Sequence, residues 1–138
     1  MSALGTFLGF AGGAMRMWCH HALGRLFTWE LSVRENHKLI TNGLYSLVRH
    51  PSYTGLILMT CGNIIYLASE RSYFVEAELW NTGLGRAIGY TLSVYLTWIT
   101  WMLCARARQE DAMLKREFGA QWDEWAERTP WKVIPFIY

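Results

Sequence analysis

The stretch of sequence that decides the fold runs from Leu84 to Cys104 and reads LGRAIGYTLSVYLTWITWMLC. Its only charge is Arg86, which lies near the start. An α-helix rises about 1.5 Å per residue, so about 20 apolar residues cross a bilayer core of roughly 30 Å. The segment has this length and composition, and we predict that it is a transmembrane helix.

Two further segments are apolar enough to enter a membrane. One runs from Tyr53 to about Ala68 and carries no charge, and the other runs from Ser2 to Met15 and ends before Arg16. The second has glycines at small-xxx-small spacing, which lets membrane helices approach closely; they are Gly5, Gly9, Gly12 and Gly13. A helix in the core of a soluble protein is the alternative for this segment.

Composition and charge agree with a membrane protein. Only 17% of the 138 residues are charged, against about a quarter in soluble domains. The eight tryptophans suit the interface between membrane and water. Since Lys and Arg favour the cytosolic side, we expect residues 16–52 and 105–138 to face the cytosol and the more acidic loop 69–82 to lie outside. A net charge of +2, with basic residues at membrane edges, argues against nucleic-acid binding.

The C-terminal part is predicted to be a cytosolic amphipathic helix. Apolar residues recur at helical spacing between Arg106 and Arg128, while Gly119 bends or divides the helix and Pro130 ends it. The last residues, WKVIPFIY, read as an extended segment that lies on the protein or the bilayer. The expected fold is therefore all-α and polytopic, with about three transmembrane helices. Residues 1–138 form one membrane core, and residues 106–138 are its C-terminal helix and tail.

Two polar clusters lie at the predicted cytosolic boundary. In the first, Asn42 and Gly43 mark a turn, and Pro51 suits the first turn of a helix. Arg49 and His50 then lie near a helix N-terminus, which favours an anionic group such as a carboxylate, although such residues also simply anchor membrane helices.

The second cluster follows the third apolar segment. Arg106 and Glu110 lie four residues apart on one helix face. They could form an ordinary ion pair or bind a zwitterionic or carboxylate substrate, and spacing does not separate the two. The three cysteines stand alone in apolar sequence, so we expect small buried hydrophobes and no metal site; they are Cys19, Cys61 and Cys104.

The combination of HKLITNGLYSLVRHPSYTG (residues 37–55), a membrane hairpin and the later RxxxEDxxLxxxFGxxWxxW resembles the isoprenylcysteine carboxyl methyltransferase family. The likeness extends from about Phe27 to Phe136. It implies an S-adenosylmethionine-dependent enzyme of the endoplasmic reticulum membrane, with several membrane spans and no metal, that methylates the C-terminal carboxylate of prenylated proteins or peptides. The carboxylate would attack the methyl group directly, and it is already ionised at neutral pH.

The resemblance also implies roles for individual residues. Arg106 matches the arginine on the substrate side, near the transferred methyl group, and is the expected catalytic residue. The residues that match cofactor contacts are His37, Lys38, Leu39, Ile40, Tyr45, His50, Pro51, Ser52, Tyr53 and Glu110.

The chain also departs from the family pattern. Asp111 replaces a usual second Glu, and Trp122 and Trp125 stand where Tyr is frequent, which we expect to keep an interfacial character. Family members carry more membrane helices upstream, so we expect either a fragment or a shortened paralogue. Three other readings remain open: a methyltransferase that acts on a phospholipid amine or another small lipophilic acceptor, an inactive membrane paralogue, and a sterol-type reductase that uses a nicotinamide cofactor.

Overall fold

The computed structural model describes residues 1–24 and 39–137, and within these ranges all regular structure is helical. The predicted all-α class is therefore confirmed for the described residues. His37 and Lys38 lie outside them. The α-helices are α1 (Ser2–Leu23), α2 (Pro51–Leu67), α3 (Tyr73–Glu76), α4 (Gly83–Ala105), α5 (Ala107–Phe118) and α6 (Ala120–Arg128), and two 3-10 turns are η2 (Gly43–Ser46) and η3 (Leu79–Asn81).

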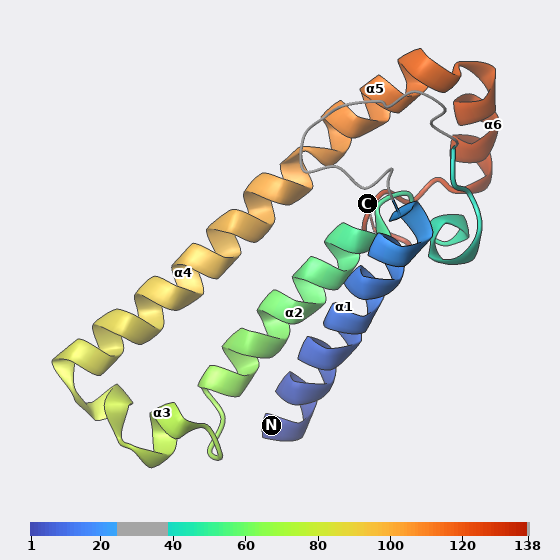
Figure 1. Ribbon diagram of the computed structural model, residues 1–138. Coiled ribbons are helices and arrows are strands. Elements are labelled where there is room, and N and C mark those ends of the chain that lie inside the picture. The colour runs from blue at the N-terminus through green and yellow to red at the C-terminus, as the bar shows by residue number, and fades with distance from the viewer. Residues whose placement is uncertain (25–38, 138) are drawn as a thin grey trace.

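Helices α1 and α2 form an antiparallel pair that lies side by side along its length (Figure 1). Glycines let the two backbones touch. A β-carbon added at Gly62 would lie 2.6 Å from the Gly5 carbonyl oxygen, and one added at Gly55 would lie 2.7 Å from that of Gly12. The small-residue prediction for α1 thus holds for Gly5 and Gly12, and their counterparts on α2 complete the contact. Helix α1 also continues through Arg16 to Leu23, beyond the predicted end.

Helix α4 is the long apolar helix predicted from residues 84–104. Within the described residues, one continuous helical stretch, 83–118, is long and apolar enough to cross a membrane. Only 11% of its most apolar segment is buried inside the protein. A helix in the core of a soluble protein would be mostly buried, so the exposed apolar surface of α4 favours lipid contact. The membrane spans predicted at α1 and α2 stay predictions.

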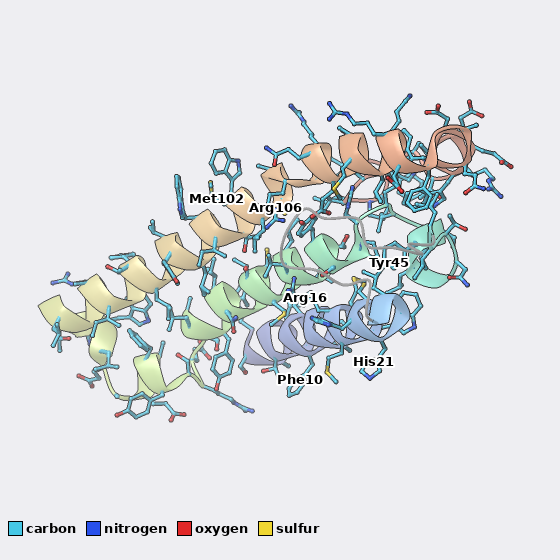
Figure 2. The ribbon with its side chains drawn as sticks, turned by 45° about the horizontal axis from the view of Figure 1, so that its top comes forward. Phe10, Arg16, His21, Tyr45, Met102 and Arg106 are labelled. Carbon is cyan, nitrogen blue, oxygen red and sulfur yellow. The ribbon has the colours of Figure 1, made fainter. Side chains whose placement is uncertain are left out.

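Contacts between α4 and α2 are fewer than those between α1 and α2. The hydroxyls of Thr60 and Thr100 form a buried hydrogen bond of 2.7 Å across the two helices. Figure 2 shows Phe10 of α1 and Met102 of α4 pointing away from the helices, and both side chains are exposed, at 76% and 47%. The apolar surface that the chain presents is therefore on the outer sides of the helical assembly.

Helix α5 continues from α4 after Arg106, and α6 turns back from the end of α5 (Figure 1). The turn is at Gly119, which has a φ of 50°, a value that favours glycine because other residues have a β-carbon. Helix α6 ends at Arg128, before Pro130. The predicted division at Gly119 and the predicted end before Pro130 are both confirmed.

A compact core lies where α1, η2 and α6 meet, and it contains Cys19, Tyr45, Trp122 and Trp125. The expected interfacial character of the two tryptophans is wrong, because they are only 9% and 3% exposed. Both are on the inner face of α6, where they cover the turn that carries Tyr45, and the Trp125 indole N–H donates to the Tyr45 carbonyl at 3.0 Å. The expectation of buried cysteines holds for Cys19 but is wrong for Cys61, which is exposed on α2.

Candidate active site

The N-terminus of α2 is fixed by its own sequence and by the C-terminal tail. Pro51 occupies the first turn, where its missing N–H is not needed, and it is fully buried. The preceding backbone N–H groups of Arg49 and His50 donate to the carbonyls of Trp131 and Lys132, at 2.9 and 2.7 Å. The tail therefore sets the backbone from which both side chains project.

Two more tail carbonyls complete this contact. The Arg49 guanidinium donates to the Pro130 carbonyl at 3.2 Å, and the Thr54 hydroxyl donates to the Val133 carbonyl. Val133 is 2% exposed, which anchors the segment. The prediction that the tail lies back on the protein is confirmed for these residues. The prediction of an extended segment is wrong, since residues 132–137 form bends and a turn closed by the Ile137 N–H and the Ile134 carbonyl.

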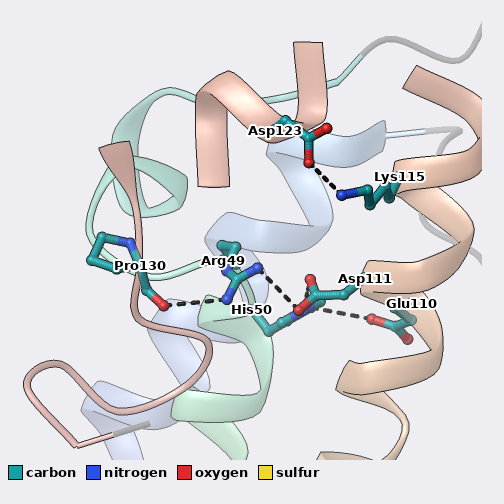
Figure 3. Close-up of polar contacts among 7 residues, drawn as sticks. All are labelled: Arg49, His50, Glu110, Asp111, Lys115, Asp123 and Pro130. Carbon is teal, nitrogen blue, oxygen red and sulfur yellow. Dashed lines mark hydrogen bonds and ion pairs between the residues drawn. The ribbon is translucent and has the colours of Figure 1, made fainter. Parts of the chain in front are cut away.

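The N-terminal part of α5 brings two acids to His50 (Figure 3). One ring nitrogen, Nε2, lies 2.9 Å from Asp111 Oδ1, and the other, Nδ1, lies 3.3 Å from Glu110 Oε2. Asp111 also pairs with Arg49, whose Nη1 lies 3.2 Å from Oδ2. The hydroxyl of Tyr53 donates to Glu110 Oε1 at 2.5 Å. Two positive and two negative groups from distant parts of the chain thus form one network.

The network shifts two pKa values in opposite directions. Burial by itself would lower the pKa of His50, but hydrogen bonds to Asp111 and Glu110, together with their charges, raise it above the ordinary value. Burial would likewise raise the pKa of Glu110, but hydrogen bonds from His50 and Tyr53 and the charges of His50 and Arg106 lower it. Glu110 is therefore an anion over the whole physiological pH range.

Glu110 is the most exposed of the four charged groups in the network. Its side chain is 26% exposed, whereas those of His50, Arg49 and Asp111 are 6%, 8% and 9% exposed. His50 faces one oxygen of the carboxylate and Tyr53 donates to the other, so both contacts fix the orientation of a side chain that is still partly exposed. The geometry suits a ligand group that donates hydrogen bonds or carries positive charge.

Arg106 lies where α4 meets α5 (Figure 2), one helical turn before Glu110. Glu110 has close partners at the start of α2, where His50 Nδ1 faces one carboxylate oxygen and the Tyr53 hydroxyl donates to the other. The charge of Arg106 is also near enough to lower the pKa of Glu110. The two side chains thus lie close together, one a carboxylate and the other a guanidinium, and can bind groups of opposite charge.

The other predicted site residues fall into two groups. Tyr45 is buried in the core of α1, η2 and α6, and Pro51 is buried at the start of α2, so both support the site from within. Leu39 and Ile40 are half-buried and pack against the same core. Ser52 is half-buried as well, and its carbonyl accepts a hydrogen bond of 3.2 Å from Arg16 of α1.

Three contributions were missing from the residues predicted for the site. Arg49 and Asp111 belong to the two polar clusters of the sequence but were given no role in the site, because their mutual contact joins the start of α2 to α5 and has no local signal. The tail carbonyls of residues 130–133 also have none, because any residue type supplies a carbonyl. Arg16 carried a signal, since a charged residue inside an apolar helix needs a partner.

The residues present fit S-adenosylmethionine in the chemistry of their donor set. The cofactor carries an ammonium group and ribose hydroxyls, and an oriented carboxylate such as Glu110 of α5 can accept hydrogen bonds from them. The cofactor also has an apolar adenine face. The half-buried side chains of Leu39 and Ile40, which precede η2, can cover such a face.

Sequence comparisons identify relatives of the chain. The profile of the "Isoprenylcysteine carboxyl methyltransferase (ICMT) family" matches residues 4–82. The chain is 30% identical over 140 residues to protein-S-isoprenylcysteine O-methyltransferase B of Arabidopsis thaliana, which covers 99% of this chain and 60% of that protein. It is 26% identical over 140 residues to a probable protein-S-isoprenylcysteine O-methyltransferase of Oryza sativa subsp. indica, covering 99% of this chain and 62% of the relative.

A second kind of relative matches over a shorter range. The chain is 25% identical over 103 residues to a delta(14)-sterol reductase of Mus musculus, covering 73% of this chain and 20% of the reductase. The chain spans about three fifths of the length of the curated methyltransferases that it matches, at 60% and 62%.

Proposed function

The chain belongs to the isoprenylcysteine carboxyl methyltransferase family, and from this premise we propose that it uses S-adenosylmethionine to methylate the C-terminal carboxylate of prenylated cysteine at a membrane. The observation that carries the proposal is Glu110, an anion held by His50 and Tyr53 and still open to a ligand. It lies just beyond the end of α4, the helix with the strongest membrane character. A lipid-linked acceptor and a polar cofactor would have to meet at such a boundary.

We assign the cofactor to Glu110, with Tyr53 and His50 holding its carboxylate and with Leu39 and Ile40 covering the apolar side. When bound, the cofactor supplies an electrophilic methyl group. Arg106 attracts the acceptor carboxylate and orients one of its oxygens, and no general base is needed because a carboxylate is ionised at neutral pH. The chain's own contribution to rate is alignment of the reactants and removal of water from the carboxylate.

We further propose that α1 and α2 cross the membrane with α4, so that the chain is a multi-pass protein of the endoplasmic reticulum membrane. The close glycine contact between α1 and α2 supports this, because membrane helices associate through small residues rather than through burial of large apolar ones. The exposed apolar surface of α4 supports a lipid-facing position. The prenyl chain of the acceptor would reach the site from the bilayer beside α4.

Binding of S-adenosylmethionine to the detergent-purified full chain, measured by calorimetry, tests the cofactor assignment. We expect saturable binding that Glu110→Gln weakens at least about tenfold, since a charged hydrogen-bond acceptor is lost. Glu117→Gln, on an exposed position of the same helix, is the matched control and should bind as the unmodified chain does. Absence of binding to a folded chain, or equal loss in both variants, would count against the proposal.

Transfer of a radiolabelled methyl group identifies the acceptor. We expect transfer to a farnesylated cysteine derivative, and we expect Arg106→Ala to reduce transfer while it largely spares cofactor binding. An amine acceptor would not need Arg106 as a carboxylate partner, so transfer to a phospholipid amine that survives Arg106→Ala would favour that substrate instead. The match to sterol reductases makes a nicotinamide-dependent reaction the second candidate; substrate-dependent oxidation of a reduced nicotinamide, without methyl transfer, would favour it.

A further inference from the structure

Next to Glu110 in the network is a buried ion pair, Arg49 and Asp111, that has no part in the proposed reaction. Arg49 and Asp111 are 8% and 9% exposed, and they form an ion pair of 3.2 Å. The Arg49 guanidinium also lies 5.4 Å from the centre of the Trp122 ring and donates to the Pro130 carbonyl. Neither residue is open to a ligand, yet Asp111 also lies 2.9 Å from the ring of His50. Removing two charged groups from water costs desolvation energy, so a buried ion pair by itself is weak evidence of a stabilising role.

The protonation of His50 follows from its contacts. An ionised carboxylate only accepts hydrogen bonds, so a ring nitrogen that faces a carboxylate must carry a proton. In His50 both nitrogens face carboxylates, Nδ1 that of Glu110 and Nε2 that of Asp111. The ring donates to both carboxylates only in the form that carries both protons and a positive charge. With Arg49 it balances the two acids, so the four groups together are neutral.

We propose that Asp111 is a positioning residue for the cofactor site: by holding the second proton on His50, it keeps a cationic ring under Glu110 and so fixes that carboxylate for its ligand. Asp111 acts through His50 and does not touch the ligand. Arg49 holds Asp111 in turn, and the tail holds Arg49 through Pro130. The inference deepens the proposed function and rests on it for the identity of the ligand, but the protonation of His50 can be measured without any ligand.

Among the described residues, charged and titratable groups near His50 come from three elements. Helix α5 contributes Glu110 and Asp111, with Arg106 just before it. The start of α2 contributes Arg49 and Tyr53, and the tail contributes Lys132, whose carbonyl accepts from the His50 backbone N–H. Among the described residues, Asp111 is the acid that contacts both Arg49 and His50. Replacing it by a neutral amide of the same shape therefore removes the charge that favours the second proton and leaves the packing nearly unchanged.

The first test is the titration of His50 by nitrogen-15 NMR on the full chain with labelled histidine, in detergent and without cofactor. The His50 signals are assigned by their loss in His50→Gln. At pH 6.5 we expect the ring to be mainly doubly protonated, and we expect Asp111→Asn to shift its titration to lower pH. Asp123→Asn is the matched control, because it removes the same charge from the exposed pair with Lys115 and should leave His50 unchanged.

The second test is affinity for S-adenosylmethionine. We expect Asp111→Asn to weaken binding about tenfold, with a rise in KM for the cofactor and a smaller change in kcat, and we expect Asp111→Glu to restore binding to within about threefold. A purely structural role would instead change stability and both kinetic constants together, without rescue by Glu.

The outcomes separate the two proposals. A His50 ring with one proton at pH 6.5 in the unmodified chain overturns the role of Asp111, and this measurement remains decisive even if Asp111→Asn does not fold. An unchanged titration in a folded Asp111→Asn overturns it as well. Absence of cofactor binding by the unmodified chain contradicts the proposed function, whereas the titration still decides whether Asp111 sets the charge of His50.

Discussion

Replacement of Gly12 by alanine tests how α1 and α2 are held together. A β-carbon at Gly12 would meet backbone atoms of α2: it would contact the Gly55 carbonyl oxygen and lie 2.8 Å from the Met59 nitrogen. Neither atom belongs to a flexible side chain that could move aside, so the helices must separate. Such overpacking costs about 1–3 kcal/mol in the free energy of unfolding.

The next residue provides the matched control. A β-carbon at Gly13 would meet no atom within 4 Å. Gly13→Ala should therefore be neutral or stabilise the protein by up to about 1 kcal/mol, because alanine favours the helix over glycine. The two variants have the same chemistry at adjacent positions and opposite expected signs, which removes any general effect of an added methyl group on detergent or lipid binding.

Thermal unfolding in detergent, followed by tryptophan fluorescence, measures both changes. At about 3 °C per kcal/mol, Gly12→Ala should lower the Tm by roughly 3–9 °C, and Gly13→Ala should leave it equal or raise it slightly. Separation of the helices should also weaken the hydrogen bond from Arg16 to the Ser52 carbonyl and thus disturb the start of α2. Equal Tm shifts in the two variants would refute the glycine contact between α1 and α2.

Three further predictions concern the interior. The free energy of unfolding should be highest between about pH 4.5 and 6.5. The raised pKa of His50 stabilises the folded state fully below pH 6.5, and this stabilisation is lost as the pH rises through the pKa of the folded state. The lowered pKa of Glu110 stabilises the folded state fully above pH 4.5, and this stabilisation is lost as the pH falls through the pKa of the folded state. Denaturant unfolding across pH checks this, and a monotonic profile would contradict it. Thr60→Val should cost about 0.6–1.7 kcal/mol, and the loss should largely disappear in a background that already carries Thr100→Val; full additivity in this cycle would show that the hydroxyls do not interact. Trp125→Phe should lower the free energy of unfolding by about 1–3 kcal/mol, because it leaves a buried carbonyl without its donor, and an unchanged unfolding midpoint would contradict that hydrogen bond.

The two halves of the site are positioned by different parts of the chain. Glu110 and Arg106 lie at the start of α5, close to the end of α4, so the position of α4 sets where they lie. His50 and Tyr53 project from the start of α2, whose position depends on α1 and on the tail. Changes far from the site, at the glycines of α1 or at Val133, should therefore alter cofactor affinity by moving one half of the site against the other.

Local features of the sequence were sufficient for the long apolar helix and for several helix ends, although not for the end of α1. The run from Leu84 to Cys104 predicts α4 because length and apolar character depend only on neighbouring residues. Pro51 and Gly119 predict a helix start and a break because their effects on φ and on backbone hydrogen bonding are confined to their own peptide groups. The motif around His50 also predicted His50 and Tyr53 as site residues, and both contact Glu110.

Only the tertiary structure decided which groups meet. Trp122 and Trp125 have the amphipathic character of interfacial residues, but the turn at Gly119 points them into the core. The spacing of Arg106 and Glu110 places them on one helix face, but only the approach of α2 brings His50 and Tyr53 to the Glu110 carboxylate. Asp111 reaches Arg49 and His50 across 61 residues or more of sequence. These contacts depend on how helices rotate and approach one another, and that is fixed by the sum of many weak packing interactions along their lengths rather than by any local pattern.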